Sequence, residues 1–395
     1  MSNHTLAVVL GIRPDVIRAS IMLDLLRASG EHDVKFIWSG QHYSDNLKDV
    51  FFREMDIKPP DIELQCGGDT DAAIASSVIA NVYDALNELR PAAVVFLGDT
   101  NTVMGAIAAG QLNIPVVHIE GCMRSYDWRM PEEKYRTVID NLSDVIYAYF
   151  DEYKEQGVRE GINPDSIVVT GNPIVDVLNK YYYDRADRYE ELASPEFFRS
   201  RGIKNGEFYL MTCHRRENVH EPASLENIFS LVGSTDRQVY FPASYRTQRV
   251  LKETGLSLPD NLVMVDPVGY QEFLLLLTRS HGTITDSGTV VEEACVLQVP
   301  ALQMRKSTER PQVYDVGACV KYDPALPDEY PIRDVLDNLE NLWGKTWDNP
   351  LGDGMSSQRI VSDLLDRLYG DRFSRHKPED YHLDINRSFR SDGSR

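Results

Sequence analysis

Residues 92–102 read Ala-Ala-Val-Val-Phe-Leu-Gly-Asp-Thr-Asn-Thr, a short apolar run that ends in glycine and leads into polar residues. An apolar run of this length predicts a strand that is buried on both faces, as in a parallel sheet. Segments with apolar residues at helical spacing separate it from its neighbours, which favours β-then-α alternation. The other runs of this kind in the first half are Thr5–Gly11, Val34–Gly40, Pro115–Gly121, Val145–Asp151 and Ser166–Gly171.

The pattern lapses between Leu178 and Asn205 and then resumes in the second half of the chain. We therefore predict an α/β protein with two doubly wound domains that face each other across a deep interdomain cleft. The expected domains are residues 1–175 and 176–370, with the helix-like stretch Ser356–Tyr369 closing the second and a loosely held polar tail over 371–395. The strands predicted in the second half are Phe208–Cys213, Gln238–Ala243, Leu262–Asp266, Gly282–Asp286 and Pro300–Met304.

Composition excludes several classes of protein. The formal net charge of -20 argues against broad binding to nucleic acid or to anionic membranes, because no basic field is available. The five cysteines form no C-x-x-C pair, which argues against a disulfide framework or a zinc site and favours a reducing compartment. The first residues lack the pattern of a signal peptide, and no apolar run is long enough to span a membrane. We expect a cytoplasmic protein.

Polar residues follow the predicted strands of the first half. Arg13 and Arg18 come after the first strand, where a helix N-terminus would favour phosphate, although they could equally be solvated arginines of an ordinary turn. Asp99 and Glu120 follow two later strands, and Glu132 opens a helix. Each carboxylate could instead cap a helix or complement its dipole, but three in close succession favour a shared site.

The second half repeats this arrangement. His214 follows a strand and precedes two arginines, a pattern that suits proton transfer beside phosphate, although a single histidine there is more often structural. Ser287 and Gly288 come before a helix and form a potential phosphate cradle, with Glu293 within reach of a ribose. Dinucleotide, Walker and zinc motifs are absent, so we expect neither a cofactor nor a metal.

Read in order, the motifs that end or follow the predicted strands are Gly11-Ile12-Arg13-Pro14-Asp15, Gly98-Asp99-Thr100-Asn101-Thr102, His118-Ile119-Glu120 with Arg124, Pro131-Glu132-Glu133 with Arg136, Thr170-Gly171-Asn172, His214-Arg215-Arg216-Glu217-Asn218, Asp286-Ser287-Gly288 with Glu292-Glu293, and Thr308-Glu309-Arg310-Pro311. As an ordered set over about residues 5–370, they resemble the non-hydrolysing UDP-N-acetylglucosamine 2-epimerase family. That family has two Rossmann-like domains, an architecture shared with glycosyltransferases of the B type.

The resemblance implies roles for particular residues and a homodimer as the expected assembly. The catalytic candidates are Asp99, Glu120, Glu132 and His214. Residues expected to bind the UDP-sugar are Arg13, Arg18, Arg136, Phe273 (beside the uracil), Ser287, Gly288 and Glu293.

The chain also departs from the family pattern. Asp15 stands where glutamate is typical, Gly121-Cys122-Met123 replaces A-G-L, and Tyr135 replaces an asparagine. Ser244 lies where some bacterial members carry a histidine associated with a second, regulatory UDP-sugar site.

The implied reaction is epimerisation at carbon 2, with UDP-N-acetylglucosamine to UDP-N-acetylmannosamine as the expected conversion. Its expected route is elimination of UDP to a 2-acetamidoglucal, followed by re-addition. The alternatives are a hydrolysing epimerase that releases UDP and free N-acetylmannosamine, a glycosyltransferase of the same fold, and a catalytically silent UDP-sugar sensor.

Overall fold

The computed structural model describes residues 5–30, 32–40, 52–53, 55–370 and 372–373. The described residues divide into two compact units. Unit 1 draws on the ranges Met1–Asp45, Ile57–Pro173 and Met355–Arg395, and unit 2 on Asn46–Asp56 and Ile174–Gly354. The polar tail predicted over residues 371–395 lies outside the described residues, apart from Arg372 and Phe373.

Within the described part of unit 1, a seven-stranded parallel sheet has the order β3-β2-β1-β4-β5-β6-β7. Its strands are β1 (Thr5–Leu10), β2 (Asp33–Trp38), β3 (Ile62–Glu63), β4 (Ala93–Leu97), β5 (Val116–Ile119), β6 (Val145–Ala148) and β7 (Ile167–Val169). The central strands β1 and β4 are buried almost completely, which explains their continuous apolar sequences.

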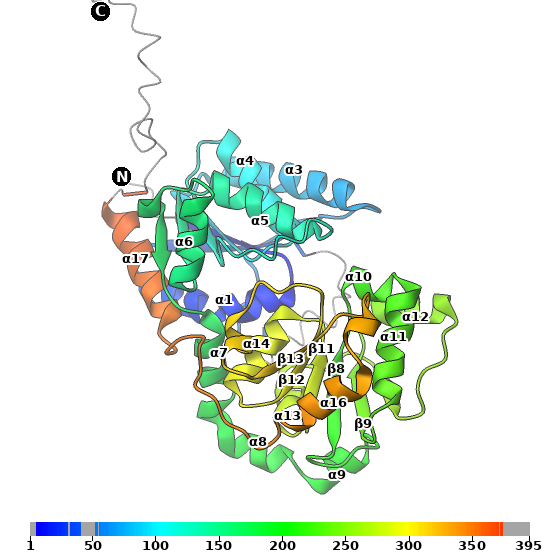
Figure 1. The fold of residues 1–395 in the computed structure, drawn as a ribbon. Helices are drawn as coiled ribbons and strands as arrows, with labels where there is room; N and C mark the ends of the chain where they lie inside the picture. The colour runs from blue at the N-terminus through cyan, green and yellow to red at the C-terminus, as the bar shows by residue number, and fades with distance from the viewer. Residues whose placement is uncertain (1–4, 31, 41–51, 54, 371, 374–395) are drawn as a thin grey trace, which may run out of the picture. The chain divides into compact units, whose positions relative to one another are not determined.

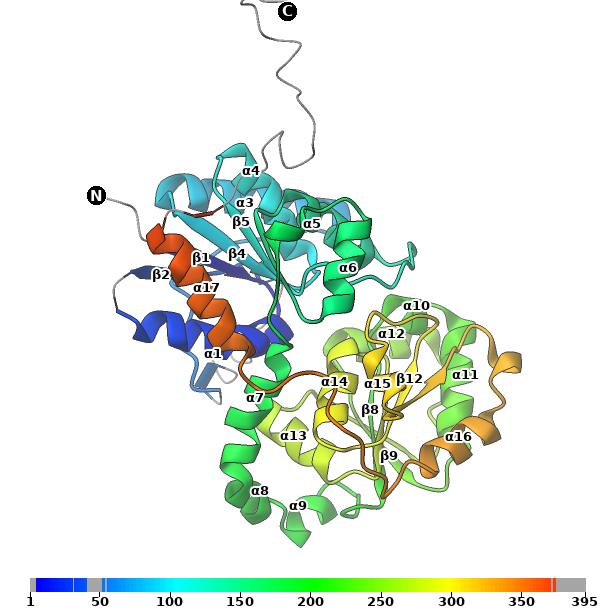
Figure 2. The same cartoon turned by 60° about the vertical axis from the view of Figure 1, so that its left-hand side comes forward.

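Helices cover both faces of this sheet (Figures 1 and 2). Apolar residues of α3, α4 and α5 pack with the strands into one core on one face. Helices α1 and α17 lie side by side on the other face. The α-helices of unit 1 are α1 (Arg13–Ala28), α3 (Asp71–Leu89), α4 (Gly105–Gln111), α5 (Pro131–Leu142), α6 (Asp151–Arg159) and α17 (Ser356–Gly370).

Unit 2 has a six-stranded parallel sheet among its described residues, in the order β10-β9-β8-β11-β12-β13. Its strands are β8 (Phe208–Thr212), β9 (Gln238–Pro242), β10 (Leu262–Val265), β11 (Gly282–Thr285), β12 (Ala301–Met304) and β13 (Cys319–Tyr322). In both sheets the strand order reverses beside the first strand, between β1 and β4 and between β8 and β11. Ligands of open α/β sheets bind beyond the carboxyl ends of the strands at such points.

The helices of unit 2 also lie on both faces of its sheet, with α13 and α14 on one side and α11, α12 and α16 on the other (Figures 1 and 2). They are α7 (Pro173–Tyr181), α8 (Ala186–Leu192), α9 (Pro195–Arg199), α10 (Arg216–Val219), α11 (Pro222–Gly233), α12 (Tyr245–Thr254), α13 (Tyr270–Thr278), α14 (Gly288–Val296), α15 (Gln312–Asp315) and α16 (Ile332–Glu340). No helix in the described part of the chain has the length and apolar character that crossing a membrane requires.

The predicted fold class, α/β with two doubly wound Rossmann-like domains, is confirmed by these two sheets. Each predicted strand forms, whereas the edge strands β3 and β13 were not predicted. β3 has only two residues, and β13 is partly exposed, so neither produces a fully apolar run. The polar stretch that we read as a lapse is helical, because a few buried side chains such as Tyr189 and Phe198 suffice to anchor α8 and α9.

Helix α17 belongs to unit 1, whereas the sequence assigned it to a domain of residues 176–370. Its Ser356 hydroxyl donates to the Gly171 carbonyl at 2.8 Å. Farther along the helix, Asp363 accepts a hydrogen bond from the Tyr147 hydroxyl at 2.8 Å. The apolar face of a terminal helix does not reveal which of two sheets it will cover, so the sequence could not settle this point.

Candidate active site

The turn between β1 and α1 carries the first two candidate residues. Gly11 directly follows the strand, and a Cβ at this position would collide with the Thr102 hydroxyl, so the turn requires glycine. Helix α1 begins at Arg13 with Pro14 in its first turn. Arg13 is half-buried and Arg18 is buried, which places one arginine at the amino end of the helix and the other just beyond its first turn.

Arg18 joins two buried carboxylates that come from different elements. Its Nη2 donates to Asp15 Oδ1 at 2.9 Å, and its Nη1 forms an ion pair with Glu120. Glu120 also accepts a hydrogen bond of 3.1 Å from the Tyr149 hydroxyl. Because an unpaired buried charge is costly, these mutual contacts hold the three charged groups in one arrangement.

The backbone at Glu120 adopts a left-handed conformation, with φ of 75°. Two residues later Cys122 has φ of 63°, at a position where the related motif carries glycine. Gly121 between them faces β6, and a Cβ there would collide with Ile146. A left-handed conformation costs a residue with a side chain about 1–2 kcal/mol, and such strain is concentrated at functional sites. The tight turn after β5 therefore directs Glu120 toward Arg18.

A second ion pair involves Asp99, which follows β4, and Arg136 on α5. Arg136 is 1% exposed and also pairs with Glu133 at 3.2 Å. Glu133 in turn accepts hydrogen bonds from the backbone amides of Ser125 and Tyr126. Glu133 thereby links the loop before α5 to Arg136, the ion-pair partner of Asp99. The candidate Glu132 lies beside it in the first turn of the helix and is half-buried.

Asp15 interacts electrostatically with both groups of ion pairs, with Arg18 in the first and with Asp99 in the second. Burial raises the pKa of Asp15 to about 7, with the Arg18 guanidinium opposing this rise and the charge of Asp99 adding to it. The carboxyl group is 1% exposed. Burial therefore makes the ionised form of this carboxyl group less favourable than in an exposed aspartate, and the Arg18 guanidinium partly compensates.

In unit 2, His214 follows β8 and its loop is organised by the buried Asp286. The Asp286 carboxylate accepts hydrogen bonds of 2.9 Å from the backbone amides of both His214 and Arg215. It also accepts one of 3.2 Å from the Asn218 side chain. The His214 imidazole is half exposed, and its Nδ1 lies 3.4 Å from Asp286 Oδ1. A carboxylate on one ring nitrogen with the rest of the ring open is an arrangement suited to proton transfer.

Ser287 and Gly288 form the amino end of α14. Ser287 is the N-cap residue, and its hydroxyl accepts from the backbone amide of Val290. Gly288 packs directly on the guanidinium of Arg310. Arg310 is only 4% exposed, and it pairs with Glu309 and with Glu292 on α14, the latter at 2.8 Å. A buried arginine thus supports a helix N-terminus whose amide groups are suited to binding phosphate.

Glu293 is buried on α14, 3% exposed, and accepts a hydrogen bond of 2.8 Å from the Tyr270 hydroxyl. Burial, reinforced by the charge of Glu293, raises the pKa of Tyr270 well above its ordinary value. Tyr270 therefore remains a hydrogen-bond donor and fixes the Glu293 carboxylate. Phe273 lies half-buried on α13, the helix that carries Tyr270.

The sequence-predicted residues accordingly fall into two groups, one in each unit. Those of unit 1 are Arg13, Arg18, Asp99, Glu120, Glu132 and Arg136, and those of unit 2 are His214, Phe273, Ser287, Gly288 and Glu293. Sequence reasoning assigned no role to the supporting residues Tyr149, Tyr270 and Arg310. Arg310 belongs to one of the motifs that carry the resemblance, but nothing in the sequence indicated its contact with Gly288.

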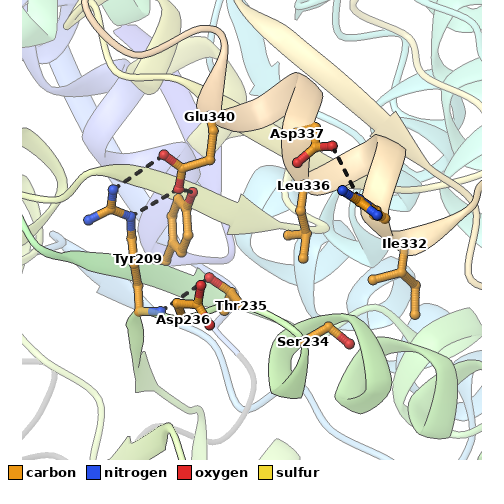
Figure 3. Close-up of a pocket in the computed structure, with 10 residues that line it drawn as sticks. Tyr209, Ser234, Thr235, Asp236, Ile332, Leu336, Asp337 and Glu340 are labelled. Carbon is orange, nitrogen blue, oxygen red and sulfur yellow. Dashed lines mark hydrogen bonds and ion pairs between the residues drawn. The ribbon is translucent and has the colours of Figure 1, made fainter.

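A surface pocket of about 690 Å³ lies elsewhere in unit 2 (Figure 3). It is at the amino ends of β8 and β9, opposite to the end that carries His214 and Ser287. In its wall Glu340 accepts hydrogen bonds from Tyr209 at 2.5 Å, Arg237 at 2.9 Å and His281 at 2.8 Å. These side chains satisfy one another, so we assign the cluster to the packing of α16 on the sheet.

Comparison with known proteins connects this arrangement to one family. The family model described as UDP-N-acetylglucosamine 2-epimerase matches residues 24–365. A Methanocaldococcus jannaschii protein named UDP-N-acetylglucosamine 2-epimerase is 35% identical over 368 residues, 91% of this chain and 98% of that protein. A Pseudomonas aeruginosa relative, UDP-2,3-diacetamido-2,3-dideoxy-D-glucuronate 2-epimerase, is 31% identical over 90% of this chain and 98% of its own length.

Solved structures agree with this relationship. The Methanocaldococcus jannaschii UDP-GlcNAc 2-epimerase in complex with UDP-GlcNAc and UDP matches with a TM-score of 0.82 and 34% identity, over 91% of this chain and 99% of that chain. The Neisseria meningitidis enzyme bound to UDP-GlcNAc matches with a TM-score of 0.77 and 26% identity, over 92% and 100% of the two chains. By its sequence over most of its length, and by a fold that these structures share, the chain belongs to the UDP-N-acetylglucosamine 2-epimerase family.

Proposed function

We propose that this protein epimerises carbon 2 of a UDP-N-acetylhexosamine and interconverts UDP-N-acetylglucosamine and UDP-N-acetylmannosamine. Its membership of the epimerase family supports the reaction. The observation that carries the proposal within this chain is the pair of carboxylates, Asp99 and Glu120, that follow the adjacent strands β4 and β5. Each is held by an arginine, Arg136 and Arg18 respectively. Acid–base groups beside phosphate-binding cations are what the reaction demands.

The reaction needs these groups because the hydrogen on carbon 2 is not next to a carbonyl and is therefore only weakly acidic. When the bond between carbon 1 and the phosphate oxygen breaks, its electron pair leaves with UDP and the hydrogen on carbon 2 becomes acidic. A base then removes that proton and a double bond forms between carbons 1 and 2. UDP adds back to carbon 1 while an acid protonates carbon 2 on the opposite face.

Each candidate residue has a role in this scheme. Cationic groups and helix N-termini stabilise the departing UDP, and acid–base groups serve the two faces of the sugar. We assign the acid–base roles to Asp99, Glu120, Glu132 and His214. UDP binding falls to Arg13, Arg18 and Arg136 with the phosphate cradle of Ser287 and Gly288, while Glu293 binds the ribose and Phe273 lies beside the uracil.

The experiment that tests this function is NMR of the purified protein with UDP-N-acetylglucosamine in heavy water. Deuterium should appear at carbon 2 of both epimers without accumulation of free UDP. Release of UDP with free N-acetylmannosamine would identify a hydrolysing enzyme. Turnover that needs an added acceptor would identify a glycosyltransferase, and binding without turnover a sensor. Epimerisation that retains the original hydrogen would overturn the elimination route.

Two further expectations belong to the same proposal, a homodimeric assembly and a cytoplasmic location. The cysteines support a reducing environment, because Cys66, Cys122, Cys213, Cys295 and Cys319 are all free and buried. Light scattering on the purified protein measures the assembly, and a single-chain mass would refute the homodimer.

A further inference from the structure

A buried histidine of unit 1 has no part in the scheme above. The ring of His118, on β5, is 0% exposed and lies between two acceptors. Its Nε2 is 2.9 Å from the carbonyl oxygen of Gly98, and its Nδ1 is 2.7 Å from Asp140 Oδ1 on α5. The ring therefore bridges the end of β4 and helix α5.

Both nitrogens of the His118 ring must carry hydrogen to make these contacts. A carbonyl oxygen only accepts, so Nε2 is the donor to Gly98. The Asp140 carboxylate also accepts from the Cys122 amide at 3.0 Å and from Arg124 Nη1 at 2.7 Å. Burial works to raise the pKa of Asp140, but His118 and Arg124 together hold that pKa below its ordinary value. An ionised carboxylate only accepts, which makes Nδ1 the second donor.

The His118 ring fixes the peptide group that links Gly98 to Asp99. The Gly98 amide donates to the Ile119 carbonyl at 3.1 Å, so both backbone polar groups of Gly98 are held by consecutive residues of β5. Gly98 has φ of 83°, and a Cβ there would lie 3.0 Å from Asp15 Oδ1. The glycine is consequently enclosed by His118 on β5 and by Asp15 on α1.

The same short segment of β5 leads into Glu120. Asp99 directly follows the peptide group that His118 binds, and Glu120 is only two residues after His118 in the chain. We propose that His118 is a positioning residue that sets the placement of Asp99 relative to Glu120, through its hydrogen bond to the Gly98 carbonyl. This inference rests on the proposed function, in which both carboxylates transfer protons.

The two single-amide replacements of His118 separate positioning from structural support. The amide nitrogen of glutamine lies near the place of Nε2, whereas that of asparagine lies near the place of Nδ1. His118→Gln should keep the donor to Gly98 and lose the donor to Asp140. His118→Asn should keep the donor to Asp140 and lose the one to Gly98. The two variants thus divide the two hydrogen bonds between them.

We expect His118→Asn to lower kcat by about 10²-fold, the scale of a displacement of about 1 Å at a catalytic group. His118→Gln should stay within about tenfold of the wild type, which corresponds to one altered hydrogen bond. UDP binding by calorimetry should change little in either variant. The thermal midpoint should be lower for His118→Gln than for His118→Asn, because His118→Gln loses the contact with Asp140. Stability and turnover should therefore rank the two variants in opposite order.

Equal losses of kcat in both variants, or losses that follow the thermal midpoint, would show that His118 only supports the fold. Asp99→Asn distinguishes this failure from failure of the proposed function. If Asp99→Asn turns over normally, the acid–base assignment is wrong. If Asp99→Asn is inactive and His118→Asn is not, only the positioning role is wrong. Should the His118 variants not fold, NMR of the wild-type protein with ¹⁵N-labelled histidine must show a slowly exchanging N–H group at Nε2 of His118. A ring whose Nε2 carries no hydrogen overturns the inference, because the Gly98 carbonyl would then have no donor from His118.

Discussion

Gly288 lies so close to the guanidinium of Arg310 that a Cβ at position 288 would be 2.5 Å from Arg310 Nη1. The Arg310 side chain cannot easily move away, because it is buried and paired with Glu292 and Glu309. Gly288→Ala should therefore displace the amino end of α14 and weaken UDP binding at least about tenfold, or about 1.4 kcal/mol. Calorimetry with UDP measures this effect.

Gly233→Ala is the matched control for this substitution. Gly233 lies in α11, where an added Cβ would meet Pro259 Cβ at an ordinary 3.5 Å. Alanine in that helix should be neutral or slightly stabilising and should leave UDP affinity unchanged. An unaltered affinity in Gly288→Ala would show that the cradle does not bind the phosphates.

Glu120→Gln and Glu132→Gln should differ in stability although both lower turnover by about 10²-fold, the scale of a general acid–base group. Glu120 is 2% exposed and paired with Arg18, so its neutralisation should also lower the thermal midpoint. Glu132 is half-buried and should leave the midpoint nearly unchanged. Kinetics and calorimetric melting measure the two effects. Full turnover in Glu132→Gln would restrict that residue to complementing the helix dipole.

The enzyme should show hyperbolic kinetics and convert the manno epimer without added gluco epimer. The resemblance places Ser244 where some bacterial members carry a histidine associated with a regulatory site. In this chain the Ser244 hydroxyl caps α12 by accepting from the Thr247 amide at 3.2 Å. Progress curves of the reverse reaction should show no lag. A lag that trace UDP-N-acetylglucosamine abolishes would contradict this expectation. As a control, Ser244→Ala should cost about 1 kcal/mol of stability as a lost cap and leave the kinetics unchanged.

Glu340 should make unit 2 sensitive to acid. Burial works to raise its pKa, but hydrogen bonds from Arg237, Tyr209 and His281 lower the pKa to about 2 from an ordinary 4.5. A depressed carboxylate pKa stabilises the fold fully above the unfolded-state value and loses that stabilisation as the pH falls from about 4.5 toward 2. Urea midpoints measured across this range should fall less in Glu340→Gln than in the wild type. If the urea midpoints of the two proteins fall equally as the pH is lowered, the hydrogen bonds of Glu340 contribute nothing to acid sensitivity.

Cys122→Gly should be more stable than Cys122→Ala, by about 1 kcal/mol. Both variants lose the buried Sγ, but only glycine relieves the left-handed backbone with its φ of 63°. In an ordinary buried position alanine is the more stable of the two residues, so the order is diagnostic. Urea denaturation of the two variants measures it, and the reverse order would show that the turn relaxes without cost.

The sequence determined the two sheets and the places where the candidate residues lie along the chain. Strands buried on both faces must be apolar almost throughout, so segments such as Ala93–Leu97 are recognisable without any structure. Ligands of parallel sheets bind at the carboxyl ends of the strands, which is why polar residues directly after the runs, such as Asp99 and Glu120, stood out as candidates.

The tertiary structure alone decided the partners of these residues and the unit to which α17 belongs. Arg18 meets Glu120, and Arg310 meets Gly288, across distances in the chain that no local pattern bridges. Such contacts depend on the order of the strands and on the direction that each loop takes. The residues that flank a position in the sequence reveal neither of these features. His118 shows the difference most clearly, because its place in a strand follows from hydrophobic pattern, whereas its two hydrogen bonds follow from the packing of β4 and α5 around it.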